Sequence, residues 1–296
     1  MTMTNRPLIL VTNDDGIASP GLRAAVRAVM PLGEVLVVAP TRQQTGAGRS
    51  LPPYDGHIQR ITLSLNGGDF EAFAVESTPA VAVMYGLTKL VPRTPSLAIS
   101  GINYGENVGA GITSSGTVGA ALEAALRGVP ALAVSLETDK KYHYSHSDEV
   151  DFSVAEHFTR EFARRMLAVR LPPDVDVLKV DVPRHATPQT PWRVTRVSRQ
   201  PYFYPIQRPG QLALDYEIQI DMDTLESDSD VYVLRIAHQV SVAPLSVDLS
   251  SRVELHHLDA LLRWAVGLHP PARDCPLGGL THTHQVKGQS EQNSLV

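Results

Sequence analysis

The sequence contains a single cysteine, no long hydrophobic run and no excess of basic residues. Because Cys275 stands alone, an internal disulfide framework is excluded and we expect a reducing compartment. No apolar segment approaches the roughly 20 residues that span a bilayer, and the N-terminal residues lack the basic-then-apolar order of a signal peptide. A net charge of −5 supplies no positive field for a nucleic-acid backbone. These absences predict a cytoplasmic protein that binds neither membranes nor nucleic acids.

The first half of the chain alternates short apolar runs with helical patterns. The runs are apolar on both faces, which is typical of buried parallel strands; they lie at 8–12, 34–40, 96–100 and 131–135. The helical patterns between them lie at 20–30, 78–90 and 117–128. A longer helix is predicted from Ser147, and another apolar run follows at 175–183. This order predicts an α/β fold with a doubly wound, mostly parallel sheet.

The second half has a different pattern. Alternating apolar and polar residues within 192–243, as at 212–220 and 231–242, predict antiparallel strands. Ser251 and Glu254 form a capping-box pattern that predicts the start of a final helix. From Gly267 onward, polar residues without periodicity predict a disordered tail. The expected organisation is a core at 1–190, a β-hairpin extension with a terminal helix at 191–266, and a tail at 267–296.

Four polar clusters follow predicted strands of the first half. They lie at 13–16, 39–50, 100–111 and 113–123. The carboxyl ends of parallel strands meet at one edge of the sheet, where such folds bind ligands. In the first cluster Asp14 and Asp15 are adjacent, and their mutual repulsion must be offset. Carboxylate, amide and hydroxyl oxygens without His or Cys are the ligands that Mg²⁺ prefers, so the sequence predicts a divalent metal site.

The fourth cluster predicts a phosphate site. Free N–H groups and hydroxyls at a helix N-terminus bind phosphate, and Ser114, Ser115, Gly116 and Thr117 stand at such a start. Asn13 and Asn107 are further candidates for contact with the substrate. Each cluster alone also fits a turn, a helix cap or a left-handed backbone position. Together, a metal and a phosphate site on one edge favour hydrolysis of a phosphate ester.

Several motifs agree with one known family in order and spacing. "LVTNDDGI", "SGIN.G.N" and "SGTV.AALE", with "VDVP" and "VSVAPLSVDL" later in the chain, closely resemble the SurE survival-protein family of metal-dependent nucleotidases. The resemblance extends to about residue 265. It implies a Rossmann-like core with a β-hairpin extension, and homodimers or homotetramers built through that extension and the final helix. It also implies hydrolysis of nucleoside 5′- and 3′-monophosphates, and in some members of short polyphosphate.

Carried over by position, the family's metal ligands fall on Asp14, Asp15, Thr45 and Asn103. The resemblance thus implies one Mg²⁺ or Mn²⁺ ion per subunit. Thr45 stands where the family usually has Ser and keeps the hydroxyl. Ser114 replaces the usual Tyr, a change that we expect to affect substrate preference more than the metal site. The other departures from the family pattern are Ser77, Val81, Ala82 and Ser96.

Other polar and aromatic side chains have alternative interpretations. The His143/His146 and His282/His284 pairs lack Cys or acidic partners at ligand spacing, which disfavours zinc. Arg42 and Arg49 are either solvated loop charges or contacts to a phosphate or a nucleotide. The aromatic residues of the expected extension either pack, join subunits or stack on a base; they are Trp192, Tyr202, Phe203 and Tyr204.

The predicted function is therefore a metal-dependent phosphatase of nucleoside monophosphates, with Asp14 and Asp15 as catalytic residues. A metal-activated water and an aspartyl-phosphate on Asp14 are both open as the route of attack. One rival hypothesis is a non-catalytic nucleotide- or phosphate-binding protein on the same scaffold. Another is a nucleotide-sugar transferase, although such enzymes normally place their acidic metal motif deeper in the chain.

Overall fold

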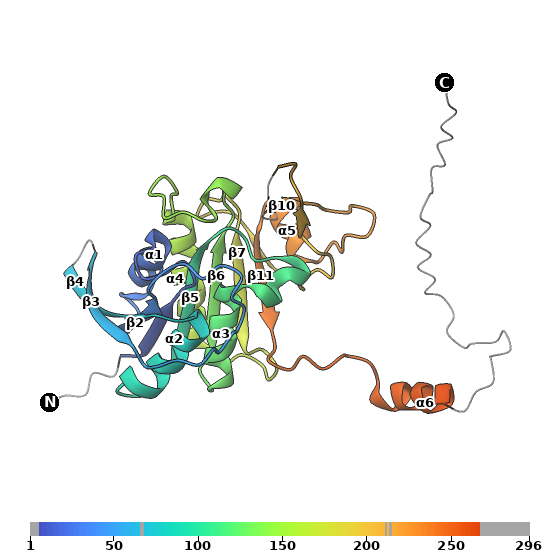
Figure 1. Ribbon diagram of the computed structural model, residues 1–296, viewed down its shortest axis with the longest axis horizontal. Coiled ribbons are helices and arrows are strands. Elements are labelled where there is room, and N and C mark those ends of the chain that lie inside the picture. Colours follow the sequence, from blue (N-terminus) through green and yellow to red (C-terminus); the bar gives the residue numbers. More distant parts are fainter. Residues whose placement is uncertain (1–5, 66–67, 211, 213–214, 267–296) are drawn as a thin grey trace, which may run out of the picture. The chain divides into compact units, whose positions relative to one another are not determined.

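Figure 1 shows the computed structural model, which describes residues 6–65, 68–210, 212 and 215–266. The predicted tail, with Cys275, His282 and His284, lies outside the described residues. The chain divides into two compact units, Met1–Asp248 and Leu249–Val296. In the part of the chain that the structure describes, no helix is long and apolar enough to cross a membrane.

The first unit contains a nine-stranded sheet with the order β3-β4-β2-β1-β5-β6-β7-β11-β8. Its central strands run parallel; they are β2 (Glu34–Pro40), β1 (Leu8–Thr12), β5 (Leu97–Tyr104), β6 (Ala131–Leu136) and β7 (Val177–Val182). Every residue of β1 is buried, as expected for an apolar run at the centre of a sheet. The predicted mostly parallel α/β fold is confirmed.

Helices cover both faces of this sheet. The helices α1 (Pro20–Val29) and α4 (Ser153–Ala168) share a core with Ile9, whereas α2 (Pro79–Tyr85) and α3 (Gly116–Leu126) share another core with Leu10. Successive residues of a strand point to opposite faces, so β1 contributes to both cores. The sheet is therefore doubly wound, as predicted. Helix α4 begins six residues later than expected, and the helix expected at 78–90 continues from α2 as a π-helical turn, Gly86–Leu90.

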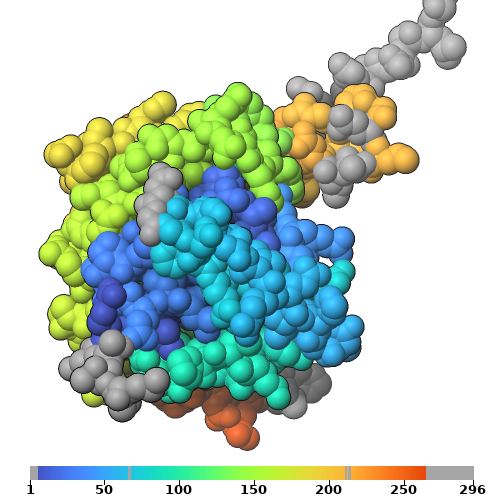
Figure 2. Space-filling model, turned by 90° about the vertical axis from the view of Figure 1, so that its left-hand side faces the viewer, coloured from blue at the N-terminus to red at the C-terminus, as the bar shows by residue number. Residues whose placement is uncertain are grey.

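One edge of the sheet was not predicted. Strand β4 (Gly68–Val75) pairs parallel with β2, and β3 (Ile58–Leu65) pairs antiparallel with β4. Figure 2 shows the molecule from this side, with the light-blue surface of the two strands facing the viewer. Residues 61–65 alternate between apolar and polar side chains, and the Asn66-Gly67 dipeptide that follows them is typical of hairpin turns, so the sequence did contain a signal for this hairpin.

The second half differs from the prediction in two ways. Strand β11 (Val240–Leu245) pairs antiparallel with β7, and β8 (Trp192–Val194) pairs parallel with β11, so the main sheet continues past residue 190. Among the described residues, only β9 (Phe203–Ile206) and β10 (Asp215–Ile218) form a separate antiparallel hairpin.

The strand predicted at 231–242 is wrong in its first half, which forms helix α5 (Asp230–Arg235). Ser229 caps this helix by accepting the Tyr232 N–H. Val231 and Leu234 pack with Tyr202 in a small separate core. The cap and this tertiary packing therefore outweigh the β propensity of the local sequence.

The second unit contains helix α6 (Leu255–Val266), which confirms the final helix. The helix begins at Leu255, and the Ser251 hydroxyl accepts the Val253 N–H at 3.4 Å. The predicted capping box between Ser251 and Glu254 is therefore not formed. Several apolar side chains of α6 are exposed to solvent; they are Leu255, Leu258, Leu262 and Trp264.

Candidate functional site

The carboxyl edge of the sheet carries a pocket of about 280 Å³. Six of the predicted site residues line it, and they come from all the clusters that follow β1, β2 and β5; they are Asp14, Thr45, Asn103, Asn107, Ser114 and Ser115. The other four, Asn13, Asp15, Gly116 and Thr117, are buried next to these residues. The fold thus brings the predicted clusters together at one place.

Asp14 is the second residue of the first cluster and is almost fully buried. Its Oδ1 accepts the Thr117 hydroxyl at 2.5 Å, and its backbone carbonyl accepts the Gln44 N–H at 2.7 Å. Gly116 lies so close that a Cβ there would be 2.7 Å from the Asp14 Cβ, so no larger residue fits. Burial raises the pKa of Asp14 to about 6, although the Thr117 hydrogen bond opposes the rise.

Asp15 is also buried and lies behind the pocket lining. Its Oδ1 accepts the Gln43 amide at 3.0 Å, and its Oδ2 accepts the Tyr104 N–H at 3.2 Å. Burial, and then the charge of Asp14, raise the pKa of Asp15 well above its usual value. No Lys or Arg among the described residues pairs with either carboxylate. A divalent cation would therefore offset the cost of burying both charges.

Asn13 has a local role in the structure. Its Oδ1 accepts the Gly16 N–H at 3.2 Å, and its Nδ2 donates to the Gly16 carbonyl at 3.1 Å. The side chain is fully buried, and both of its polar atoms are engaged in this turn. Asn13 therefore shapes the turn that presents the two carboxylates.

Asn103 belongs to β5 itself, because this strand continues beyond the predicted end at residue 100. Its Nδ2 donates to the carbonyls of Gly105 at 2.7 Å and Tyr104 at 3.3 Å. These bonds leave Oδ1, an oxygen ligand of the type that Mg²⁺ prefers, without a hydrogen bond from the described residues. The pairing of β5 with β6 shifts register just before this position. Gly101 is required there, because a Cβ would lie 2.3 Å from the Val134 carbonyl oxygen.

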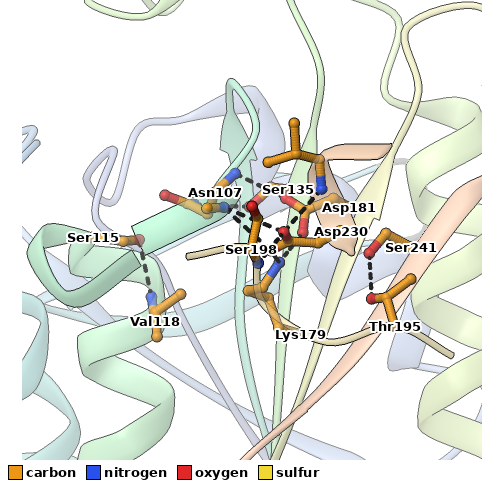
Figure 3. Close-up of polar contacts among 12 residues, drawn as sticks. Asn107, Ser115, Val118, Ser135, Lys179, Asp181, Thr195, Ser198, Asp230 and Ser241 are labelled. Carbon is orange, nitrogen blue, oxygen red and sulfur yellow. Dashed lines mark hydrogen bonds and ion pairs between the residues drawn. The ribbon is translucent and has the colours of Figure 1, made fainter. Parts of the chain in front are cut away.

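The start of α3 forms another wall of the pocket. Ser115 is the N-cap of the helix, and its hydroxyl accepts the Val118 N–H at 3.2 Å, as Figure 3 shows. Ser114 donates its hydroxyl to the Gly111 carbonyl at 2.8 Å and remains exposed. Ser115 therefore acts as a helix cap, and Ser114 is the more accessible hydroxyl.

The loop after β2 packs against this helix start. The Gly48 N–H donates to the Ser114 carbonyl at 2.9 Å, and Thr45 is exposed at the rim of the pocket. Arg49 pairs with the buried Glu123 at 3.1 Å. Arg49 thus has a structural role, because its ion pair connects the loop to α3. Arg42 is an exposed residue of the same loop.

Another part of the pocket lining combines His143 and the β9–β10 hairpin. The His143 Nδ1 lies 2.6 Å from the Tyr216 hydroxyl, and Phe203 packs edge-on against both rings. The His146 Nε2 lies 2.6 Å from the Asp15 carbonyl oxygen. Within the described residues, no group of three or more His, Cys, Asp or Glu side chains is placed to hold a metal ion.

Glu106 is a pocket residue that the sequence reasoning missed. Its Oε1 accepts the Tyr202 hydroxyl at 2.6 Å, while its buried Oε2 has no hydrogen-bond partner in the described part of the chain. Burial raises the pKa of Glu106 to about 7, with Tyr202 acting in the opposite direction. The available signal was an acidic residue within the Gly- and Asn-rich segment 100–111.

Comparisons with known proteins agree with this geometry. The family model described as Survival protein SurE matches residues 9–203. A 5′-nucleotidase SurE of Thermococcus kodakarensis is 39% identical over 257 residues, covering 86% of this chain and 98% of the relative. A 5′-nucleotidase SurE of Methanothermobacter thermautotrophicus is 46% identical over 199 residues, covering 66% of this chain and 74% of the relative.

A solved structure gives the same result for the fold. The crystal structure of the SurE protein from Aquifex aeolicus superimposes with a TM-score of 0.68 at 27% identity, covering 88% of this chain and all of that chain. The matching segment of the family model includes every residue that we place around the pocket from Asp14 to Phe203. The chain therefore belongs to the SurE family.

Proposed function

We propose that the chain is a divalent-metal-dependent 5′-nucleotidase that hydrolyses nucleoside 5′-monophosphates to a nucleoside and phosphate. The observation that carries the proposal is the pair of buried carboxylates, Asp14 and Asp15, without a described basic partner at a pocket edge. Relatives that match 86% of the chain carry the name 5′-nucleotidase, which supports the same reaction. Hydrolysis of 3′-monophosphates and short polyphosphate is a further proposal, which rests on the family resemblance alone.

For the metal ion we propose Asp14, Asp15, Thr45 and Asn103 as ligands. The donor set fits a hard cation, because it consists of carboxylate, hydroxyl and amide oxygens. The Asn103 Oδ1 accepts no hydrogen bond from the described residues, and Thr45 lies at the rim of the same pocket. Mg²⁺ and Mn²⁺ both suit these oxygens, and we propose one ion per subunit. Such an ion, when bound, supplies polarisation of the phosphoryl oxygens.

For the phosphate we propose the N-terminus of α3, with the Ser114 hydroxyl and the Asn107 side chain. The free N–H groups at the start of an eleven-residue helix favour an anion. Thr117 holds Asp14 through the 2.5 Å hydrogen bond, so it positions a metal ligand. Gly116 allows the helix start to approach that carboxylate. Asn13 is assigned to the turn, because both of its polar atoms are engaged there.

Phosphate release from a panel of nucleoside 5′- and 3′-monophosphates, measured with Mg²⁺, Mn²⁺ or EDTA, tests the proposal. We expect turnover of 5′-monophosphates that EDTA abolishes and added Mn²⁺ restores. We expect Asp14→Asn to lose this turnover. Asp69→Asn is its matched control, because it makes the same change at the exposed start of β4. Turnover that resists EDTA would reject the metal. Nucleotide binding without turnover would favour the non-catalytic alternative.

The assembly and the location of the protein are separate proposals. The exposed aromatic residue Trp192 on β8 and the apolar side chains of α6 favour association into a homodimer or homotetramer. Light scattering at micromolar protein measures this directly, and a mass of 32.1 kDa would reject it. A cytoplasmic location stays a prediction from the single cysteine.

A further inference from the structure

A second cluster of buried charges lies near the pocket, between strand β7 of the sheet and the start of helix α5. Lys179 and Asp181 are two residues apart on β7 and share one face of that strand. Figure 3 shows their side chains together with that of Asp230, the first residue of α5. The Lys179 Nζ lies 2.5 Å from Asp181 Oδ2 and 3.1 Å from Asp230 Oδ2. All three side chains are completely buried.

The ammonium group of this cluster is charged. Burial alone would lower the pKa of Lys179, but the charges of Asp181 and Asp230 outweigh burial and raise it. Two carboxylates and one ammonium buried in a sheet are costly to desolvate, and apolar residues of similar volume often stabilise a fold as well or better. Stability alone is thus a poor explanation for the cluster. The contacts of the remaining carboxylate oxygens indicate another role.

Those oxygens hold the backbone that follows β5. Asp181 Oδ1 accepts the Asn107 N–H at 2.8 Å. Both carboxylate oxygens of Asp230 accept the Gly109 N–H at 3.3 Å, and Asp230 Oδ1 also accepts the Ser198 N–H at 2.9 Å. The backbone N–H groups of Asn107 and Gly109 therefore bond to two carboxylates that both contact the Lys179 ammonium.

The anchored segment carries a side chain of the candidate site. The Asn107 Nδ2 donates to the Ser135 hydroxyl at 2.8 Å and lies 3.5 Å from the Thr117 hydroxyl oxygen. Thr117 donates in turn to Asp14 at 2.5 Å. A continuous set of polar contacts thus joins the buried charge cluster to the pocket.

We propose that Lys179 is a positioning residue: it holds Asp181 and Asp230, which fix the backbone at Asn107 and Gly109, and so it sets the direction of the Asn107 amide in the pocket. The inference rests on the proposed function for its kinetic readout. Lys179 does not line the pocket, so it acts through these carboxylates. A small displacement of a substrate-holding group is sufficient to cost roughly 100-fold in rate.

Lys179→Met tests the proposal, because it keeps most of the side-chain volume and removes the charge. Without the ammonium, the two buried carboxylates repel each other and the Asn107 and Gly109 anchors shift. At a temperature where circular dichroism shows the variant to be folded, we expect KM for a nucleoside 5′-monophosphate to rise at least tenfold. We expect kcat to fall less, because the proposed role of Asn107 is to bind the phosphate and not to take part in the chemical step.

Asp181→Asn provides a second test if Lys179→Met does not fold. The Asn107 N–H and the Lys179 ammonium bond to different oxygens of Asp181, and Asn replaces one of these oxygens with an NH₂ donor, so one of the two bonds is lost. We expect the same rise in KM. Ser241→Ala is the matched control: Ser241 is buried, pairs with Asp181 across the sheet and bonds to Thr195 at 2.9 Å, without contact to the pocket segment. Its KM should match that of the wild type.

A KM within twofold of the wild type in a folded Lys179→Met or Asp181→Asn variant would overturn the proposal. An equal KM change in Ser241→Ala would also overturn it, since general destabilisation would then explain the result. Calorimetry with inorganic phosphate and Mn²⁺ measures the same effect without turnover, and we expect Kd to rise at least tenfold in both variants. If the wild type hydrolyses no nucleotide, the proposed function fails, and an unchanged phosphate Kd separately rejects the positioning role.

Discussion

Replacing Asp14 by Asn tests the electrostatic argument for the site. The change removes one of two adjacent buried carboxylates and keeps the shape of the side chain. In the wild type without metal, a rise of the Asp14 pKa from 3.8 to about 6 corresponds to a cost of about 3 kcal/mol once the group is ionised. Removing the Asp14 charge also relieves Asp15, whose pKa that charge helps to raise.

The sign of the pH dependence follows from the direction of this shift. An acid whose pKa is raised on folding costs no stability below its unfolded pKa and its full cost above its folded pKa. The metal-free wild type therefore loses stability as the pH rises from about 4 to beyond 6, and the Asn variant does not share this loss. The Asn side chain of the variant has one acceptor oxygen instead of two, and we expect the loss of the second buried acceptor to reduce this gain by about 1 to 2 kcal/mol.

Urea denaturation in EDTA at pH 5 and pH 8 measures the difference. We expect Asp14→Asn to gain about 1 to 2 kcal/mol on the wild type between these pH values, and to be the more stable protein at pH 8. Adding Mn²⁺ at 100 times its Kd should stabilise the wild type by about 2.7 kcal/mol and the variant far less. A pH-independent difference would refute the burial argument, and equal stabilisation by Mn²⁺ would place the ion elsewhere.

Three other changes test the remaining contacts. Thr45→Val keeps the shape of the side chain but removes the proposed ligand oxygen, so the Mn²⁺ concentration for half-maximal activity should rise. Thr45→Ser should leave this concentration nearly unchanged. An unchanged concentration in Thr45→Val would remove Thr45 from the site. Gly116→Ala places a Cβ 2.7 Å from Asp14, so we expect a stability loss of about 1 to 3 kcal/mol and weaker Mn²⁺ binding by calorimetry. Tyr202→Phe removes the hydroxyl that donates to Glu106. A hydrogen bond to an ionised carboxylate is stronger than one to a neutral carboxyl, and the pKa of Glu106 is about 7. Urea denaturation should therefore show a larger loss in the free energy of unfolding at pH 8.5 than at pH 5.5.

Much of the central fold and of the candidate site could be predicted from local sequence patterns. The strands at the centre of the sheet are apolar on both faces, which allowed β1 and β2 to be predicted with their observed bounds. Asp14 and Asp15 are adjacent in the chain, so their repulsion is evident without a structure. The edge rule for parallel sheets was sufficient to expect that the clusters after β1, β2 and β5 meet.

Prediction was weaker where tertiary contacts outweigh local propensity. The 231–242 segment alternates like a strand, yet Ser229 caps a helix there and Val231 packs with Tyr202. Asn13 belongs to the most informative motif of the sequence, but its hydrogen bonds to Gly16 turn it away from the pocket. The hairpin of β3 and β4 was missed, although the alternating residues 61–65 and the Asn66-Gly67 dipeptide indicate it.

The sequence alone therefore determined the α/β class, the family and the group of residues at the carboxyl edge of the sheet, because each depends on neighbouring residues or on the order of motifs. Only the tertiary structure decided which of these side chains face the pocket and which support it. It also revealed Glu106 beside Tyr202, and Lys179 between Asp181 and Asp230. Lys179 and Asp230 are about 50 positions apart, and their contact exists only once the sheet and α5 have packed. Burial then gives these charges their energetic importance, since desolvation depends on the whole fold around a group.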